Sequence, residues 1–156
     1  MRNQIFITIF FLIPCLFMSH AWADDIVGKW KAINDRTGVH EANILIYQNN
    51  DGSYDGKIEK IYDLPNGTPQ KVEKCTQCAG ELKDQPLIGL RILSHFTKHP
   101  KNPNEYVNGL VVDPETGKTY KGTIRMSSNG KKMTLNGYVG ISLLGRTQTW
   151  IKSRDQ

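Results

Sequence analysis

Two cysteines and two histidines have a spacing that suits a bound metal ion. Cys75 and Cys78 are separated by two residues, and His95 and His99 follow with three residues between them. Two thiolates and two imidazoles at such spacings hold zinc tetrahedrally. The segment between the pairs slightly exceeds the usual length, and the two histidines also suit a solvent-exposed rim. A zinc-holding module built from these four residues is therefore an alternative, and no metal is part of the main interpretation.

The first 23 residues favour a disulfide for the cysteine pair. Arg2, an apolar run from Ile5 to Met18 and the segment Ala21-Trp22-Ala23 are typical of a cleaved export signal, and the run is short for a membrane anchor. We expect residues 1–23 to be removed, which leaves a domain of residues 24–156 in the periplasm or outside the cell without stable membrane insertion. An oxidising compartment and an even cysteine count then predict a local Cys75–Cys78 disulfide.

Enzymatic chemistry has little support in the sequence. Thioredoxin-like redox chemistry uses a Cys-x-x-Cys pair at the start of a helix in an α/β sheet, and the pattern around Cys75 is not of that kind. Ser142 lies outside any nucleophile-elbow pattern, and no carboxylate pair stands at an informative spacing. We therefore expect a protein that is not an enzyme and that needs no cofactor.

The elements that position these residues are predicted to be β-strands. From Tyr106 to Lys152 apolar and polar residues alternate, as in half-buried antiparallel strands, and Asn129-Gly130 has the chemistry of a tight hairpin. Earlier strands are expected at residues 42–48, 54–63 and 87–93. No segment has a convincing helical period, so the fold class is all-β. A long connection over residues 64–85 contains the cysteine pair, and loops of this length usually have a function or are held in place by a structural constraint.

The first and last strands have residues typical of a closed barrel. Gly28 and Trp30 form a Gly-x-Trp motif in the first strand, as in lipocalin-like barrels, where the Trp plugs one end and a basic side chain from late in the chain packs over its face. Trp150 is expected in the core near the first strand. We assign all three residues structural roles.

The charge pattern speaks against nucleic acid as a partner. The chain carries 20 Lys and Arg residues against 15 Asp and Glu residues, a net charge of +5. The basic residues are scattered along the predicted outer rows of strands and form no run interleaved with aromatic residues, so a solvated surface is the plain interpretation.

Several motifs together resemble one known family. They are GKW, CTQCAG, DQPLIGLRIL, GLVVDPETGKTYKGTIRM and LNGYVGISLLGRTQTWIK. This combination is similar to the domain-of-unknown-function family 2147, small exported proteins of Gram-negative bacteria, over residues 26–152. The resemblance implies a single antiparallel up-and-down β-barrel of about eight strands, similar to lipocalins, that encloses a small ligand. It implies no reaction.

A barrel of this size holds either packed side chains or one small ligand. Inward aromatic and aliphatic residues, with Arg146 at the barrel mouth, are candidate ligand contacts: Tyr47, Tyr62, Tyr106, Tyr120, Met126, Met133, Leu135 and Arg146. For Arg146 a structural role, such as stacking on an aromatic ring, competes with binding of an anionic ligand group. The same apolar residues would also suit a filled core.

The main hypothesis is an exported lipocalin-like protein that binds a small hydrophobic or amphipathic molecule. Its rival is an envelope interaction or stress-related structural protein with a filled barrel core. The zinc-holding module is the third alternative.

Overall fold

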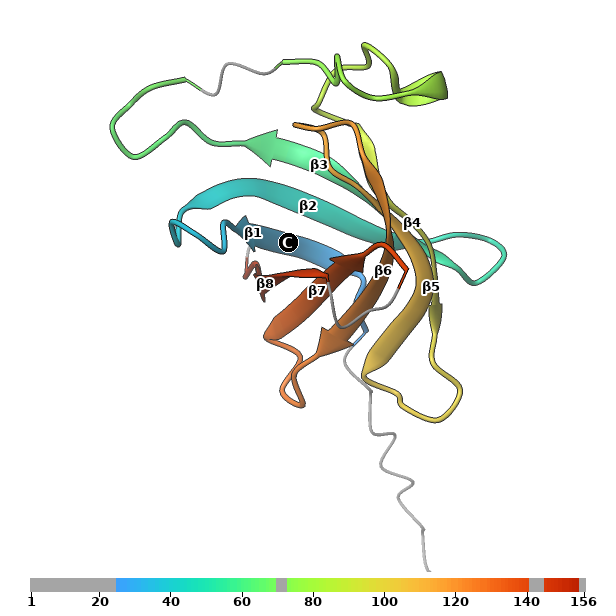
Figure 1. Ribbon diagram of the computed structural model, residues 1–156. Coiled ribbons are helices and arrows are strands. Elements are labelled where there is room, and N and C mark those ends of the chain that lie inside the picture. Colours follow the sequence, from blue (N-terminus) through green and yellow to red (C-terminus); the bar gives the residue numbers. More distant parts are fainter. Residues whose placement is uncertain (1–24, 70–72, 141–144, 155–156) are drawn as a thin grey trace, which may run out of the picture.

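The computed structural model describes residues 25–69, 73–140 and 145–154 of the chain. In these residues eight strands follow one another: β1 (Gly28–Ile33), β2 (His40–Gln48), β3 (Tyr54–Ile61), β4 (Arg91–Lys98), β5 (Glu105–Val112), β6 (Thr119–Met126), β7 (Lys132–Tyr138) and β8 (Arg146–Lys152). Each strand pairs antiparallel with the next, and β8 pairs with β1, so the sheet closes into a barrel (Figure 1). The predicted all-β up-and-down barrel is confirmed.

The strand alternation explains which side chains enter the barrel. In β6 the buried residues are Gly122, Ile124 and Met126, while Lys121 and Arg125 on the alternate row are exposed. In β7 the buried residues are Met133 and Leu135. These inner rows follow the period of two that the sequence showed.

The predicted fourth strand differs from the observed one at both of its boundaries, and the predicted third strand ends two residues beyond β3. We expected a strand at residues 87–93 followed by a polar loop, but β4 covers Arg91–Lys98. Leu87 and Leu90 are buried in the connection that precedes β4, so their apolar character reflects a packed loop. Phe96 lies within β4, and its buried ring occupies the space that side chains on Gly109 and Gly122 would need, since Cβ atoms there would lie 2.4 and 2.6 Å from ring carbons.

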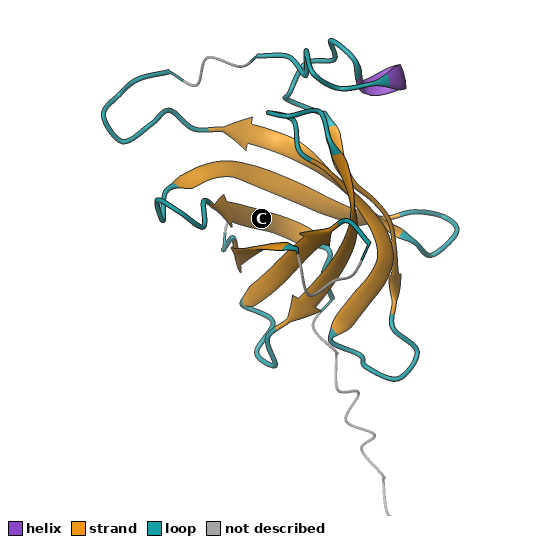
Figure 2. Cartoon of the chain, viewed as in Figure 1, coloured by secondary structure: helices purple, strands orange, loops and turns teal. Residues whose placement is uncertain are grey.

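The direction of the strands gives the barrel two different ends. Odd strands finish, and even strands begin, at the end that we call the mouth. The opposite end, the closed end, holds the start of β1, the finish of β8 and the β2–β3, β4–β5 and β6–β7 hairpins (Figure 2). The two ends are therefore built from different sets of connections.

The closed end is packed around Trp30. This residue is fully buried, and its indole Nε1 donates a hydrogen bond to the carbonyl oxygen of Ile26 at 2.8 Å. Lys152, its cross-strand partner on β8, places Nζ 5.6 Å from the indole ring centroid and donates to the carbonyl oxygen of Asp25 at 2.9 Å. The predicted cation-π contact from a late basic residue is thus present, and Trp150 lies beside β1, opposite Ala32.

Tyr106 completes the closed end. Its fully buried ring meets Tyr54 edge-on at 5.0 Å between centroids. Its hydroxyl donates to Asp25 Oδ1 at 3.2 Å and accepts from the Ile26 amide at 3.3 Å. Burial raises the pKa of the Tyr106 hydroxyl well above its ordinary value. The segment before β1 is thereby fixed across the end of the barrel.

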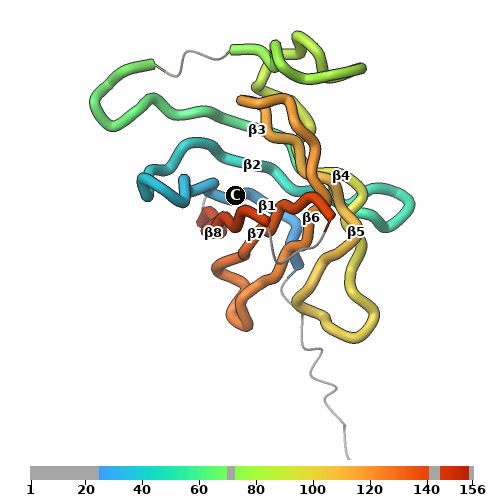
Figure 3. The backbone as a smooth tube through the Cα atoms, in the orientation of Figure 1, coloured from blue at the N-terminus to red at the C-terminus, as the bar shows by residue number. Residues whose placement is uncertain are grey.

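The long β3–β4 connection is anchored by the predicted disulfide. Cys75 and Cys78 are bonded and buried, and a short 3-10 helix, η1 (Gly80–Leu82), follows them. The connection packs on the β5–β6 hairpin, which lies beside it in Figure 3: the sulfur of Cys75 is 3.4 Å from the Pro114 carbonyl oxygen. Gly117 faces Gln77 so closely that a Cβ atom there would lie 1.8 Å from the Gln77 carbonyl oxygen. The hairpin and the disulfide segment therefore form one unit at the mouth.

Two predictions fall on the part of the chain that the structure does not describe. The export signal at residues 1–23 lies outside the described residues, as do residues 141–144, which contain Ser142. Within the described ranges, no helix has the length and apolar character needed to span a membrane.

Candidate functional site

The barrel interior opens at the mouth into a cavity of about 570 Å3. Its position follows from the inner rows: beyond the level of Ile44 and Trp150, the inward residues of β1 and β2 are the small Ala32 and Ala42, which pair with each other. Larger residues at the closed end fill the corresponding space. The cavity is within the size range of small-molecule sites.

The deep wall of the cavity is apolar. It is lined by apolar side chains from seven strands: Ala32, Ala42, Ile44, Ile58, Ile92, Val111, Val112, Leu135 and Trp150. The indole Nε1 of Trp150 donates to Gln148 Oε1 at 3.2 Å, so the polar atom of this large side chain is already hydrogen-bonded. A hydrocarbon or ring system placed here would lose contact with water and meet few unpaired polar groups.

The rim of the cavity is polar and charged. It includes Arg36, Glu41, Asp113, Glu115 and Arg146. The apolar deep wall and the charged rim together suit a ligand with one apolar and one polar end.

Arg146 is fixed at the rim by an ion pair with Asp35 of the β1–β2 connection. Its Nε lies 3.2 Å from both carboxylate oxygens, and its Nη2 also contacts Oδ1. The hydrogen bonds from Arg146 hold the pKa of Asp35 below its ordinary value. The same bonds raise the pKa of Arg146. This bidentate geometry gives Arg146 a structural partner within the chain.

The eight predicted ligand contacts separate into three groups. Tyr120, Leu135 and Arg146 line the mouth cavity. Tyr106, Met126 and Met133 are buried at the closed end, away from the cavity lining.

Tyr47 and Tyr62 belong to the third group, which lies outside the barrel. The inward residues of β2 are Ile44 and Ile46, so Tyr47 faces outward, where Lys57 Nζ lies 5.9 Å from its ring centroid. Tyr62 follows β3, packs against the His40 ring in a tilted arrangement with 4.3 Å between ring centroids, and accepts a hydrogen bond from Asn43 at 3.1 Å. Neither tyrosine lines the cavity, because the alternation of β2 and the bulge between β2 and β3 direct them outward.

Sequence reasoning missed most of the apolar wall. Ala32, Ala42, Ile58 and Ile92 were not among the candidates, since no single side chain there suggests a ligand. These residues could have been found from their position in the strands. In an up-and-down barrel, inner-row residues near the end of odd strands and near the start of even strands face the mouth. Small residues at such positions indicate space.

The alternative zinc site does not form in this structure. The sulfurs of Cys75 and Cys78 are joined to each other and so are not two thiolate ligands. His95 is exposed on β4, and the Nδ1 atom of His99 accepts hydrogen bonds from the amides of Lys101 and Asn102. Among the described residues, no cluster of three or more His, Cys, Asp or Glu side chains has metal-binding geometry.

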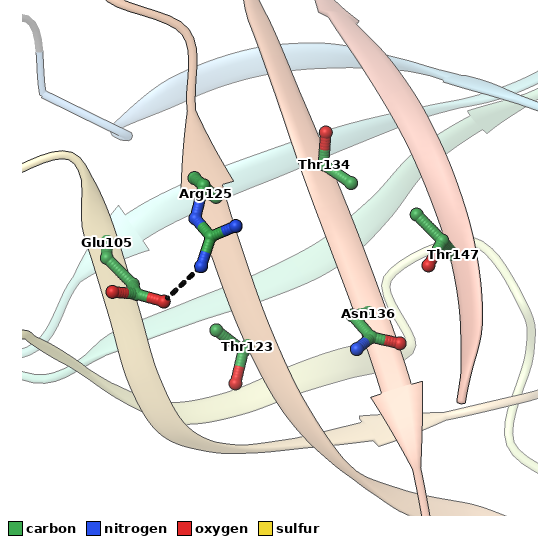
Figure 4. A pocket seen from close by; sticks show the side chains of 6 residues that line it. All are labelled: Glu105, Thr123, Arg125, Thr134, Asn136 and Thr147. Atoms are coloured by element: carbon green, nitrogen blue, oxygen red, sulfur yellow. Dashed lines mark hydrogen bonds and ion pairs between the residues drawn. The ribbon is translucent and has the colours of Figure 1, made fainter. Parts of the chain in front are cut away.

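A second hollow lies on the outer face of the barrel. It has a volume of about 290 Å3 and is lined by Glu105, Thr123, Arg125, Thr134, Asn136 and Thr147 (Figure 4). Arg125 and Glu105 form an ion pair at 3.0 Å at one side of it. The side chain of Arg125 is 69% exposed, and every lining side chain has polar atoms, so this hollow lacks the apolar wall of the mouth cavity.

The comparisons with known proteins agree with the barrel. The family described as "Uncharacterized protein conserved in bacteria (DUF2147)" matches residues 28–152. No curated protein matches the sequence. A solved structure that is similar is protein HP1028 from the human pathogen Helicobacter pylori, which belongs to the lipocalin family; the two share 20% sequence identity, 84% of each chain is covered, and the TM-score is 0.68. At this identity the likeness shows the fold.

Proposed function

We propose that this chain, which belongs to the bacterial family DUF2147, holds a small amphipathic molecule in the mouth of its barrel. The observation that carries the proposal is the cavity of about 570 Å3, with an apolar wall and a charged rim. Burying apolar ligand surface contributes roughly 25 cal/mol per Å2, so a wall of aliphatic side chains and one indole favours hydrocarbon or ring groups. The rim then orients the polar end.

The protein is proposed to hold this molecule and not to convert it. Of the described residues that line the cavity, none is a histidine, cysteine or serine. The carboxylates of the lining belong to the rim, where Glu41 accepts a hydrogen bond from Asn34 at 2.6 Å and Asp113 accepts from the backbone amide of Glu115 at 2.9 Å. These contacts shape the connections around the mouth.

Export is part of the proposal. The signal-like residues 1–23 and the Cys75–Cys78 disulfide support a periplasmic or secreted protein. Expression of the full chain in a Gram-negative host, followed by fractionation and intact mass measurement, tests this. We expect a mature protein that starts at Asp24; an uncut chain in the cytoplasm would contradict it.

Ligand occupancy is tested by native mass spectrometry of the purified mature protein before and after denaturation. A bound mass that is lost on unfolding supports the proposal and identifies the class of molecule. A binding assay with the uncharged dye N-phenyl-1-naphthylamine then locates the site. The dye should gain fluorescence in the cavity and quench Trp150.

Ala42→Phe places a ring in the cavity and should weaken dye binding at least tenfold. Ala79→Phe is the matched control, because Ala79 is exposed beside the disulfide and is not part of the cavity lining. Thermal unfolding of both variants checks that they are folded. Equal dye binding by both variants would place the site elsewhere. Absence of dye binding by the wild-type protein, together with an empty native mass, would favour a protein-interaction role with a ligand-free barrel.

A further inference from the structure

We infer that the polar end of the ligand is cationic, such as a primary or quaternary ammonium group on an apolar chain. This inference rests on the proposed function, because it concerns the same cavity. It follows from which charges at the rim are already paired within the protein and which are not.

The rim cation best placed for an anionic ligand group is already paired. Arg146 forms its bidentate ion pair with Asp35, and this pair joins the start of β8 to the β1–β2 connection. An anionic group would have to displace the Asp35 carboxylate from a geometry that suits guanidinium. Arg146 is therefore poorly available to a ligand.

The remaining rim charges are mainly acidic. Glu41, Asp113 and Glu115 line the cavity, against Arg36 as the other basic side chain of the rim. In the described part of the chain, no ion pair within 4.0 Å joins any of these carboxylates to a basic side chain. The hydrogen bonds that Glu41 and Asp113 accept come from neutral amides, which leave the negative charge in place. Asp113 and Glu115 also raise the pKa of Arg146, after the larger effect of Asp35.

Aromatic side chains in the same cavity add a second preference for a cation. Tyr120 and Tyr138 both line it. Tyr120 lies over Gly137, where a hypothetical Cβ atom would be 3.6 Å from the Tyr120 Cβ atom. The face of a tyrosine ring attracts ammonium groups, and quaternary ammonium ligands are bound in this way. An aliphatic chain in the apolar wall would bring its head group to the level of these rings and carboxylates.

The acidic rim contrasts with the chain as a whole, whose net charge is +5. Charges beyond about 8 Å are screened at physiological ionic strength, so a head group at the mouth responds mainly to the rim. A carboxylate or sulfate head would instead face unpaired carboxylates. The local charge and not the net charge should decide which head group binds.

The test compares two probes with the same ten-carbon chain, decyltrimethylammonium and decyl sulfate, at concentrations where both are monomeric. Displacement of the uncharged dye from the wild-type protein reports binding. We expect the cationic probe to bind about tenfold more tightly at low salt, and this preference to decrease as salt is added, because exposed charges are screened.

Variants then connect the preference to the rim. The double variant Glu41→Gln, Glu115→Gln keeps side-chain shape and removes two charges, and it should lower the preference about threefold or more. Glu81→Gln is the matched control, since Glu81 is exposed on η1 outside the cavity lining. Glu81→Gln should leave the dye affinity and the probe preference unchanged. The preference of each variant is the ratio of its two probe affinities, so a general change in dye affinity does not count as a change in head-group preference.

The outcomes separate this inference from the proposed function. Equal binding of the two probes, or tighter binding of decyl sulfate, would overturn the cationic head while the binding cavity stands. A preference that the double variant leaves intact would also overturn it, because the rim would not be its source. If neither probe nor the dye binds, both the inference and the proposed function fail.

Discussion

The closed end and the mouth of this barrel are built from the same eight strands, but the interior is filled by side chains at the closed end and hollow at the mouth. At the closed end, Trp30, Phe96 and Tyr106 are almost fully buried, and the polar atoms of Trp30 and Tyr106 are hydrogen-bonded within the chain. At the mouth, Ala32 and Ala42 leave space and the charged groups surround an opening. The difference shows that side-chain size along the inner rows, with unchanged backbone pairing, determines where a barrel is filled and where it is hollow.

Two neighbouring inner-row residues of β7 give the largest expected contrast. Met133 is packed at the closed end, and Leu135, two residues later, lines the cavity. Met133→Ala should lower the free energy of unfolding by about 2–5 kcal/mol, because the surrounding core relaxes only partly into the space. The loss of unfolding free energy in Leu135→Ala should be smaller than that in Met133→Ala by at least about 1 kcal/mol, because the adjoining cavity already admits solvent or ligand.

Urea unfolding and dye titration check this pair together. Met133→Ala should leave the dye affinity unchanged, while Leu135→Ala should change it. If both variants lose the same free energy and bind the dye alike, the mouth is as tightly packed as the closed end, and the comparison fails.

The rim is expected to depend on the contact between the disulfide segment and the β5–β6 hairpin. Gly117 has a φ of 68°, and a Cβ atom there would collide with the Gln77 backbone. Gly117→Ala should therefore displace the segment from the rim. Gly67→Ala is a matched control, with a φ of 77° and no atom within 4 Å of the added Cβ.

The control isolates backbone strain, about 1–2 kcal/mol. Gly117→Ala should lose more free energy of unfolding than the control Gly67→Ala does. Hydrogen exchange should increase in residues 113–118, while the amides around Trp30 stay protected. Equal losses in the two variants would show that the docking contact does not support the rim.

The closed end was largely predictable from sequence because its signals are carried by individual residues. The Gly28-x-Trp30 motif and the late basic residue each indicate one local arrangement. The inner rows around Met126 and Met133 indicate inward side chains but not the end of the barrel at which they lie, and these two residues were predicted as ligand contacts. The mouth was predictable only in part. Its cavity depends on the absence of side-chain volume at Ala32 and Ala42, and the outward direction of Tyr47 and Tyr62 depends on strand alternation and a bulge.

The disulfide segment, like the mouth, was predictable from the sequence only in part. The Cys75–Cys78 bond was predictable from spacing and compartment. Its docking on the hairpin was not, because the contact with Pro114 and Gly117 joins residues about forty positions apart in the sequence. The buried Leu87 and Leu90 were taken for strand residues because a packed loop and a buried strand have the same apolar pattern.

Lys152 provides a smaller test of the closed end. Lys152→Met keeps the aliphatic part of the side chain but removes the charge over Trp30 and the hydrogen bond to the Asp25 carbonyl oxygen. The free energy of unfolding should fall by about 1 kcal/mol, the size of a partly exposed cation-π contact. Lys121→Met on the outer face of β6 should have little effect. A dye affinity that changes with Lys152→Met would show that the two ends are coupled.

The smallest expected effect concerns the ion pair at the rim. The Arg146 hydrogen bonds hold the pKa of Asp35 below its ordinary value of 3.8, so folding favours the charged carboxylate. The stabilisation is fully present above the unfolded-state pKa and is lost as the pH falls through the lower folded-state value. Asp35→Asn should therefore be less stable than the wild-type protein at pH 7, by under about 1 kcal/mol for a pair this exposed. The difference should stay constant down to about pH 5 and shrink below pH 4. Thermal unfolding of both proteins across this range measures it, and a difference that grows in acid would mean that Asp35 is stabilised in its protonated form.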